Sequence, residues 1–183
     1  MLNSKSLIKV SAGLILVSTI GFSGKAQAQS VAVPFGGSAS STCEFTASTA
    51  GILVRSATSA AMEGSSGVSG LSAGNAGTAT VNCTNGGSLT VAVPVPISVP
   101  VGYVPAVLQS IVQRGTNIGS ADFTSANTGG PFDTNAWNKP TAALAIPVGV
   151  SALNIAMVAG TQANGPVPSG NYKYDVVLSI VSN

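Results

Sequence analysis

The sequence contains no histidine among its 183 residues. Without an imidazole, neither a Ser-His-Asp nor a Cys-His catalytic site can be built. A glycosidase needs only two carboxylates, and Asp122 and Asp133 would have to converge in a cleft to supply them; we interpret both as solvated loop residues. Two cysteines alone do not complete a four-ligand zinc site. The sequence therefore predicts that the protein is not an enzyme and uses no metal or cofactor.

Charge is also scarce. Charged residues make up 7% of the chain, against roughly 25% in typical soluble domains. Three of the seven basic residues, Lys5, Lys9 and Lys25, belong to an N-terminal leader, which leaves four basic and five acidic residues. These are spread along the sequence, so the clustered cations that bind nucleic acid or anionic membranes are missing. A β-rich surface with so little charge tends to associate with other copies.

The leader has the parts of a secretory signal peptide. Lys5 and Lys9 precede an apolar stretch at residues 10–22, and Ala-Gln-Ala at residues 26–28 has the form of a peptidase site. The apolar stretch of about 13 residues is too short to span a bilayer, which takes roughly 20 helical residues. We expect a signal peptide at residues 1–28, export of the mature chain, and no membrane span after cleavage.

Both cysteines, Cys43 and Cys83, follow the leader. An exported chain enters an oxidising compartment, so a disulfide between them is the expected state, and two unpaired buried thiols are the alternative. The disulfide would close a loop of about 40 residues and contribute roughly 4 kcal/mol to stability.

Short apolar alternations predict an all-β domain. Residues 78–83 place Ala79, Val81 and Cys83 on one face, and a longer alternation with a single core face runs from Leu89 to Val99. Prolines at 94, 96 and 100 indicate that this second strand lies at an edge or leaves its sheet after about Val93. Further strands are expected at residues 31–35, 43–54, 144–148, 151–159 and 171–181.

Three segments are less regular. Residues 103–114 fit a helix or a strand, and the context of the chain favours a strand. Residues 55–77 are small and polar, which predicts a long exposed loop, and residues 115–141 are predicted as a polar connection. About eight strands with turns such as Asn85-Gly86-Gly87 between them predict a sandwich of two antiparallel sheets.

The arm, the two cysteines and the last strand occur in a characteristic order. An apolar arm at residues 29–42 precedes Cys43; about 40 residues later comes Gly-Thr-Ala-Thr-Val-Asn-Cys-Thr at 77–84, and the last strand follows Pro-Ser-Gly-Asn-Tyr at 168–172. In this order and spacing the chain resembles the spore coat protein U domain, the subunit family of archaic chaperone–usher pili. The resemblance implies an immunoglobulin-like sandwich at residues 43–183 that is incomplete and lacks its last strand.

The resemblance also implies assembly partners and a pathway of secretion to the cell surface. A periplasmic chaperone would fill the vacant groove first, an outer-membrane usher would take the subunit to the cell surface, and the arm of the next subunit would then replace the chaperone. This is β-strand addition, in which backbone hydrogen bonds give strength and alternate side chains fill pockets. Such head-to-tail contacts propagate as a fibre.

On this sequence the candidate donor residues are Val31, Val33 and Phe35. The candidate acceptor groove is the alternating face of the last strand: Tyr172, Tyr174, Val176, Leu178 and Ile180. Pro34 removes one ladder hydrogen bond, and Gly36-Gly37 would interrupt a longer donor. The second hypothesis is therefore that the arm is the domain's own first strand and that the protein is a monomeric coat or binding protein, secreted or attached to the surface.

Overall fold

The computed structural model describes residues 40–57, 60–115, 122–128, 137, 139, 141–161 and 165–183. Within these residues the chain is all-β, with antiparallel pairing throughout and no helix. The described residues therefore contain no helix long and apolar enough to cross a membrane. The predicted fold class, an antiparallel β-sandwich, is confirmed. The predicted signal peptide and the candidate donor residues Val31, Val33 and Phe35 lie outside the described residues.

The strands are β1 (Cys43–Thr49), β2 (Val54–Arg55), β3 (Ala61–Gly64), β4 (Gly77–Cys83), β5 (Gly87–Val91), β6 (Val95–Ser98), β7 (Val107–Arg114), β8 (Asp122–Thr128), β9 (Leu144–Ile146), β10 (Gly149–Gly160), β11 (Lys173–Asp175) and β12 (Leu178–Ser182).

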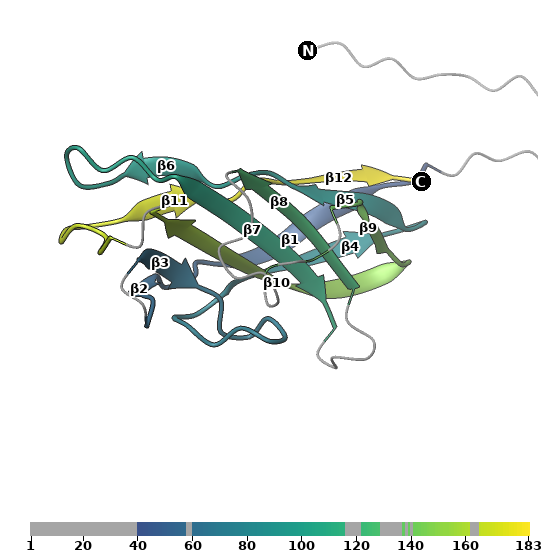
Figure 1. Ribbon diagram of the computed structural model, residues 1–183. Helices are drawn as coiled ribbons and strands as arrows, with labels where there is room; N and C mark the ends of the chain where they lie inside the picture. Colours follow the sequence, from purple (N-terminus) through teal and green to yellow (C-terminus); the bar gives the residue numbers. More distant parts are fainter. Residues whose placement is uncertain are drawn as a thin grey trace, which may run out of the picture. The chain divides into compact units, whose positions relative to one another are not determined.

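One layer is built around the long strand β10 (Figure 1). Its first half pairs with β4 and its last four residues pair with β3, both on the same edge. Its other edge pairs with β7, and β8 extends the sheet beyond β7. β1 lies outside β4, and β2 lies outside β3.

The second layer has two parts that continue each other. β5 lies between β12 and β9, and β6 pairs with β11. The Ala92 N–H donates to the Val177 carbonyl at 2.9 Å between the two parts. The predicted strand at 171–181 is therefore two strands, β11 and β12, with Val176 and Val177 at the break.

The layers enclose an apolar core. The predicted face of β4 is confirmed, since Ala79, Val81 and Cys83 are all buried. Leu89 of β5 is fully enclosed, and burying a side chain of this size contributes roughly 1.5–3 kcal/mol. The other buried members are Val91, Val112, Leu144, Ile146 and Leu153.

The prediction of an exposed loop at residues 55–77 is partly wrong. The segment contains β3, and Val68 is buried against the face of β7 and β10 that points away from the main core, in a second cluster with Ala61, Ile111, Trp137, Ala156 and Val158. Gly74 permits the close approach, because a Cβ there would lie 2.3 Å from the Ile52 carbonyl oxygen, and its φ is 58°. Tight backbone packing therefore requires glycine at position 74, and a reading of hydrophobicity alone does not detect this.

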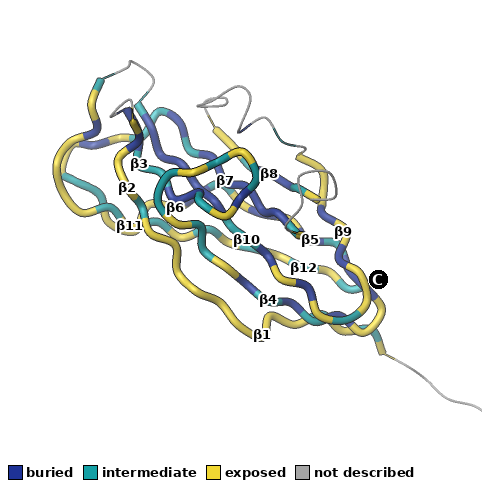
Figure 2. The backbone as a smooth tube through the Cα atoms, turned by 90° about the horizontal axis from the view of Figure 1, so that it is seen from below, coloured by how far each residue is buried: buried dark blue, intermediate teal, exposed yellow. Residues whose placement is uncertain are grey.

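Two other expectations were partly wrong. The single core face expected from Leu89 to Val99 ends with β5 at Val91, and Val95 and Ile97 of β6 are about half exposed. The polar connection expected at 115–141 contains β8, which pairs only with β7 in the described part of the chain. The ambiguous segment 103–114 contains β7, which confirms the strand. Burial patterns along all these strands can be followed in Figure 2.

Candidate functional site

The sandwich is closed along one side and open along the other. On the closed side β8 contacts β9 and β5, and Leu144 and Ile146 are buried. On the open side, in the residues described, β1 pairs only with β4, β11 only with β6 and β12 only with β5. Figure 2 shows β1 as a largely exposed edge. Two sheet edges without a further partner strand therefore border the same side of the molecule.

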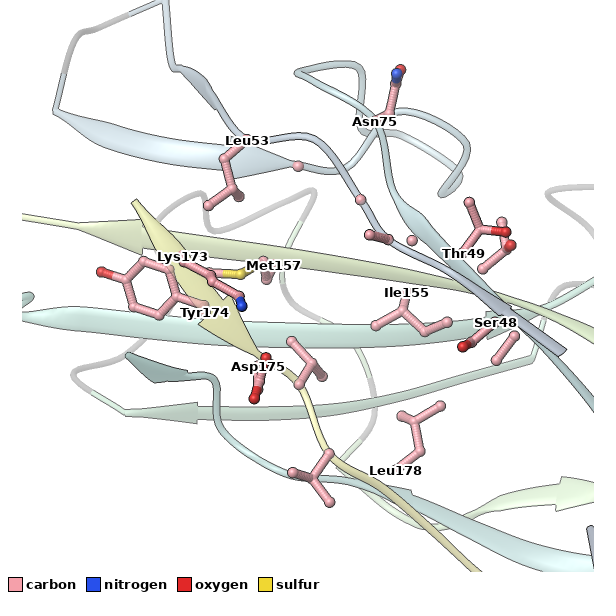
Figure 3. Close-up of a pocket in the computed structure, with 18 of the residues that line it drawn as sticks. Ser48, Thr49, Leu53, Asn75, Ile155, Met157, Lys173, Tyr174, Asp175 and Leu178 are labelled. Carbon is pink, nitrogen blue, oxygen red and sulfur yellow. The ribbon is translucent and has the colours of Figure 1, made fainter. Parts of the chain in front are cut away.

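A groove runs between these two edges (Figure 3). Its larger part, which we call the wide part, has a volume of about 620 Å³ and lies between the end of β1 and β11. Its smaller part, which we call the narrow part, has a volume of about 430 Å³ and lies beside the middle of β1. Both parts are lined by Ser48, Ala79, Val176 and Leu178, so they form one continuous groove. Large apolar side chains line the wide part: Leu53, Ile155, Met157, Val176 and Leu178.

The predicted disulfide is present and joins Cys43 of β1 to Cys83 of β4, directly opposite it. The neighbouring Thr84 N–H donates to the Thr42 carbonyl, so the cysteines occupy a non-hydrogen-bonded pair, where side chains on adjacent strands are closest. Gly87 of β5 leaves room for the sulfur, because a Cβ there would lie 2.7 Å from Cys43 Sγ. The disulfide thus fixes the edge strand β1 to the sheet.

The groove ends near the disulfide, where β1 and β12 contact each other. Ser182 Oγ at the end of β12 donates to the Ser41 carbonyl at 3.3 Å, just before β1 begins. We call this end of the sandwich, marked by Cys43 and Ser182, the disulfide end. From there β1 and β12 border the groove in opposite chain directions.

All three tyrosines of the chain gather at the other end, which we call the tyrosine end. The rings of Tyr103 and Tyr172 meet edge to face with centroids 5.3 Å apart. Tyr103 Oη donates to the Ala159 carbonyl at 3.3 Å, and Tyr172 Oη donates to the Pro168 carbonyl at 2.6 Å. Burial, followed by the proximity of Tyr103 and Tyr172, raises the pKa of Tyr174 far above its ordinary value.

This raised pKa makes the fold sensitive to alkali. Above about pH 10 a tyrosine in the unfolded chain ionises while Tyr174 in the folded chain keeps its proton, so the unfolded state binds fewer protons and stability falls. The free energy of unfolding should be level up to about pH 9 and decline at higher pH. Denaturant titrations from pH 8 to 11 should show a shallower decline in Tyr174→Phe, and an equal decline in both chains would refute this assignment.

The five residues predicted to line an acceptor groove alternate along the end of the chain, and each is half-buried. Four of them, Tyr172, Tyr174, Val176 and Leu178, line the groove. Ile180 packs against the core cluster near the disulfide end instead. Of the two acids considered for catalysis, Asp122 forms an ion pair with Arg114 and Asp133 lies outside the described residues.

Sequence analysis missed the other walls of the groove. Phe45 lines its narrow part and is 42% exposed, although it stands opposite Val81, which is fully buried. Ile155 and Met157 reach the wide part from β10. The exposure of Phe45 depends on which strand is absent beside it. No local pattern in the sequence reports that absence.

The backbone of β12 has an open edge. Ala92 N–H donates to the Val177 carbonyl and Asn183 N–H donates to the Gly86 carbonyl, at opposite ends of the β5–β12 pairing. Because antiparallel pairing alternates, odd-numbered residues of β12 direct their N–H and C=O groups toward β5. The N–H and C=O groups of Leu178 and Ile180 therefore point to the open side.

The arrangement offers binding surface and no identifiable catalytic or metal centre in the described residues, where no cluster of three or more metal-ligating side chains occurs. Comparisons with protein-family models, with curated proteins and with solved structures found no match. The groove between β1 and β11–β12 is therefore the feature on which a functional proposal must rest.

Proposed function

We propose that this chain is an exported structural subunit of a pilus-like fibre, and that its groove binds an extended strand from another copy. The observation that carries the proposal is the open side of the sandwich. There an apolar groove lies between two strand edges, and Phe45, Val176 and Leu178 are left partly exposed. A strand laid in the groove would bury these side chains and complete the core.

An extended peptide suits both the chemistry and the geometry. The open N–H and C=O groups of Leu178 and Ile180 supply a ladder for a new neighbour, and alternate side chains of that neighbour would enter the groove. Val31, Val33 and Phe35 alternate in this way. The low charge of the chain suits a subunit that associates with its own kind.

Side-chain size supports one direction for the incoming strand. The wide part of the groove lies at the tyrosine end and the narrow part nearer the disulfide end. A donor antiparallel to β12 would place Phe35, its largest side chain, in the wide part and Val31 in the narrow part. A donor parallel to β12 would place the phenyl ring where the groove closes.

The same reasoning favours a second copy over the chain's own arm. The arm continues into Ser41 and Cys43 at the disulfide end. An arm folding back into its own groove would therefore run from the tyrosine end to the disulfide end, parallel to β12, and would carry Phe35 to the narrow part. An arm from another copy can enter in the favoured direction, so the contact is head-to-tail and extends as a fibre.

The periplasmic chaperone and outer-membrane usher belong to this proposal. An open apolar groove is an aggregation hazard before assembly, and a chaperone strand in the groove would protect it during transit. Export follows from the expected signal peptide, and the surface or extracellular destination follows from passage through the usher.

Val176 and Val181 give a matched test. Val176 lines the groove, whereas Val181 of β12 lines neither part of it and is 69% exposed. Val176→Asp should abolish assembly, because the carboxylate would be buried against the donor's apolar face, whereas Val181→Asp should assemble as the parent does. Material sheared from cells and run in detergent without boiling should give a ladder for the parent and Val181→Asp alone. A ladder from Val176→Asp equal to the parent's would refute the groove as the assembly site.

A further inference from the structure

An apolar projection stands at the tyrosine end, between β6 and β7 (Figure 1, left). Tyr103 N–H donates to the Pro100 carbonyl at 3.0 Å and closes a turn with Gly102, φ 79°, at its centre. Val101 in this turn is fully exposed and Val104 beside it is 81% exposed. We call Val101 and Val104 the tip.

The tip is held firmly in place. Tyr103 is buried, and its hydroxyl donates to the Ala159 carbonyl near the end of β10. Pro100 packs on Gly170, where a Cβ would lie 2.7 Å from the proline ring. Two valines are therefore displayed to solvent by a fixed turn, which is costly for an isolated subunit and useful for a docking surface.

A second exposed apolar site lies at the disulfide end. Val148 and Val150 flank Gly149 at the start of β10 and are 66% and 72% exposed. Gly149 stands opposite Cys83 in the sheet register. We call Val148 and Val150 the base. Tip and base are separated by the length of β10, 12 residues, or about 36 Å at the usual rise of a strand.

Neither site carries charge. No Asp, Glu, Lys or Arg occurs in residues 83–113, which include the tip, or in residues 140–172, which include the base. Contact between the two sites therefore buries apolar surface without desolvating an ion, which is the favourable case for association.

We propose that the tip of one copy packs on the base of the next copy along the fibre. This inference rests on the proposed function. With a donor strand antiparallel to β12, Phe35 sits at the acceptor's tyrosine end, and eight residues later Cys43 begins the donor's own β1. That linker reaches at most about 29 Å when fully extended. The donor's disulfide end, with its base, is thus held close to the acceptor's projecting tip.

Cysteine pairs in the full exported chain test the contact directly. V101C combined with V150C should give a ladder that survives boiling without reductant and collapses when reductant is added. V101C alone, V150C alone, and V101C with T90C should give ladders that collapse on boiling, because Thr90 is exposed on β5 away from both ends. The native disulfide lies within one subunit and cannot link copies.

The outcomes separate this inference from the proposed function. If unboiled samples show the ladder but the V101C/V150C pair never becomes covalent, or if T90C links equally well, the tip–base contact is wrong while strand donation stands. If no ladder forms in any chain, both fail. As a second measure, V101D should lower the temperature at which the ladder dissociates. The melting temperature of the unassembled subunit should stay unchanged. An unaltered dissociation temperature would overturn the contact.

Discussion

Replacing Cys43 with serine is expected to lower the free energy of unfolding by roughly 4 kcal/mol, a large part of the 5–15 kcal/mol typical of a domain. The disulfide closes a loop of 40 residues, so breaking it returns conformational entropy to the unfolded chain. It also fixes β1, an edge strand with six of its seven residues exposed, to β4. As an edge strand, β1 otherwise depends on its pairing with β4 alone among the described residues.

Denaturant unfolding with and without reductant measures this effect. The parent should lose the same stability on reduction that Cys43→Ser loses by mutation, and Cys43→Ser with Cys83→Ser should match the single variant apart from the effect of the free thiol. Because β1 forms one wall of the groove, assembly should weaken in the same variants. Equal unfolding free energies for the oxidised and reduced parent would show that the disulfide does not stabilise the fold.

Mixing two variants that cannot assemble alone is expected to give dimers and nothing larger. Val33→Asp places a charge on the apolar face of the arm but keeps the groove, and Val176→Asp spoils the groove but keeps the arm. Each alone should remain monomeric. In the mixture the intact arm of Val176→Asp can enter the intact groove of Val33→Asp, and the chain then stops because neither remaining end is competent.

The adjacent Ala32 supplies the control for the arm. Ala32→Asp puts the same charge on the opposite face of the alternation, and this variant should form the full ladder. Size-exclusion chromatography with light scattering distinguishes monomer, dimer and polymer. Monomers in the mixture would show that the arm and groove do not bind each other, and polymers from Val33→Asp alone would show that Val31–Phe35 is not the donor.

The strands that could be predicted from the sequence are those with a clean apolar face. β4 and β5 bury the residues that alternation indicated, because each lies inside a sheet with a core on one side. β8 was missed because edge pairing to β7 sustains it with polar residues such as Thr124 and Ser125, both buried. β3 was missed because close backbone packing around Gly74 favours residues that resemble a loop.

The groove could be predicted only in part, for a physical reason. Tyr172, Tyr174, Val176 and Leu178 share one face of a terminal segment, and that pattern is local. Phe45, Ile155 and Met157 are brought to the same groove from distant strands by sheet topology. The incomplete burial of Phe45 and Ile155 follows from the open edge between β1 and β12, which is a property of the whole sandwich.

Amide hydrogen exchange on β12 tests the central claim most directly. The Val33→Asp monomer, whose groove is free, should be compared with its dimer with Val176→Asp. Leu178 and Ile180 should exchange quickly in the monomer and slowly in the dimer, because their N–H groups gain partners in the donor strand, while Ser179 and Val181, already paired with β5, should be slow in both. Unchanged exchange at Leu178 and Ile180 in the dimer would contradict strand addition at this edge.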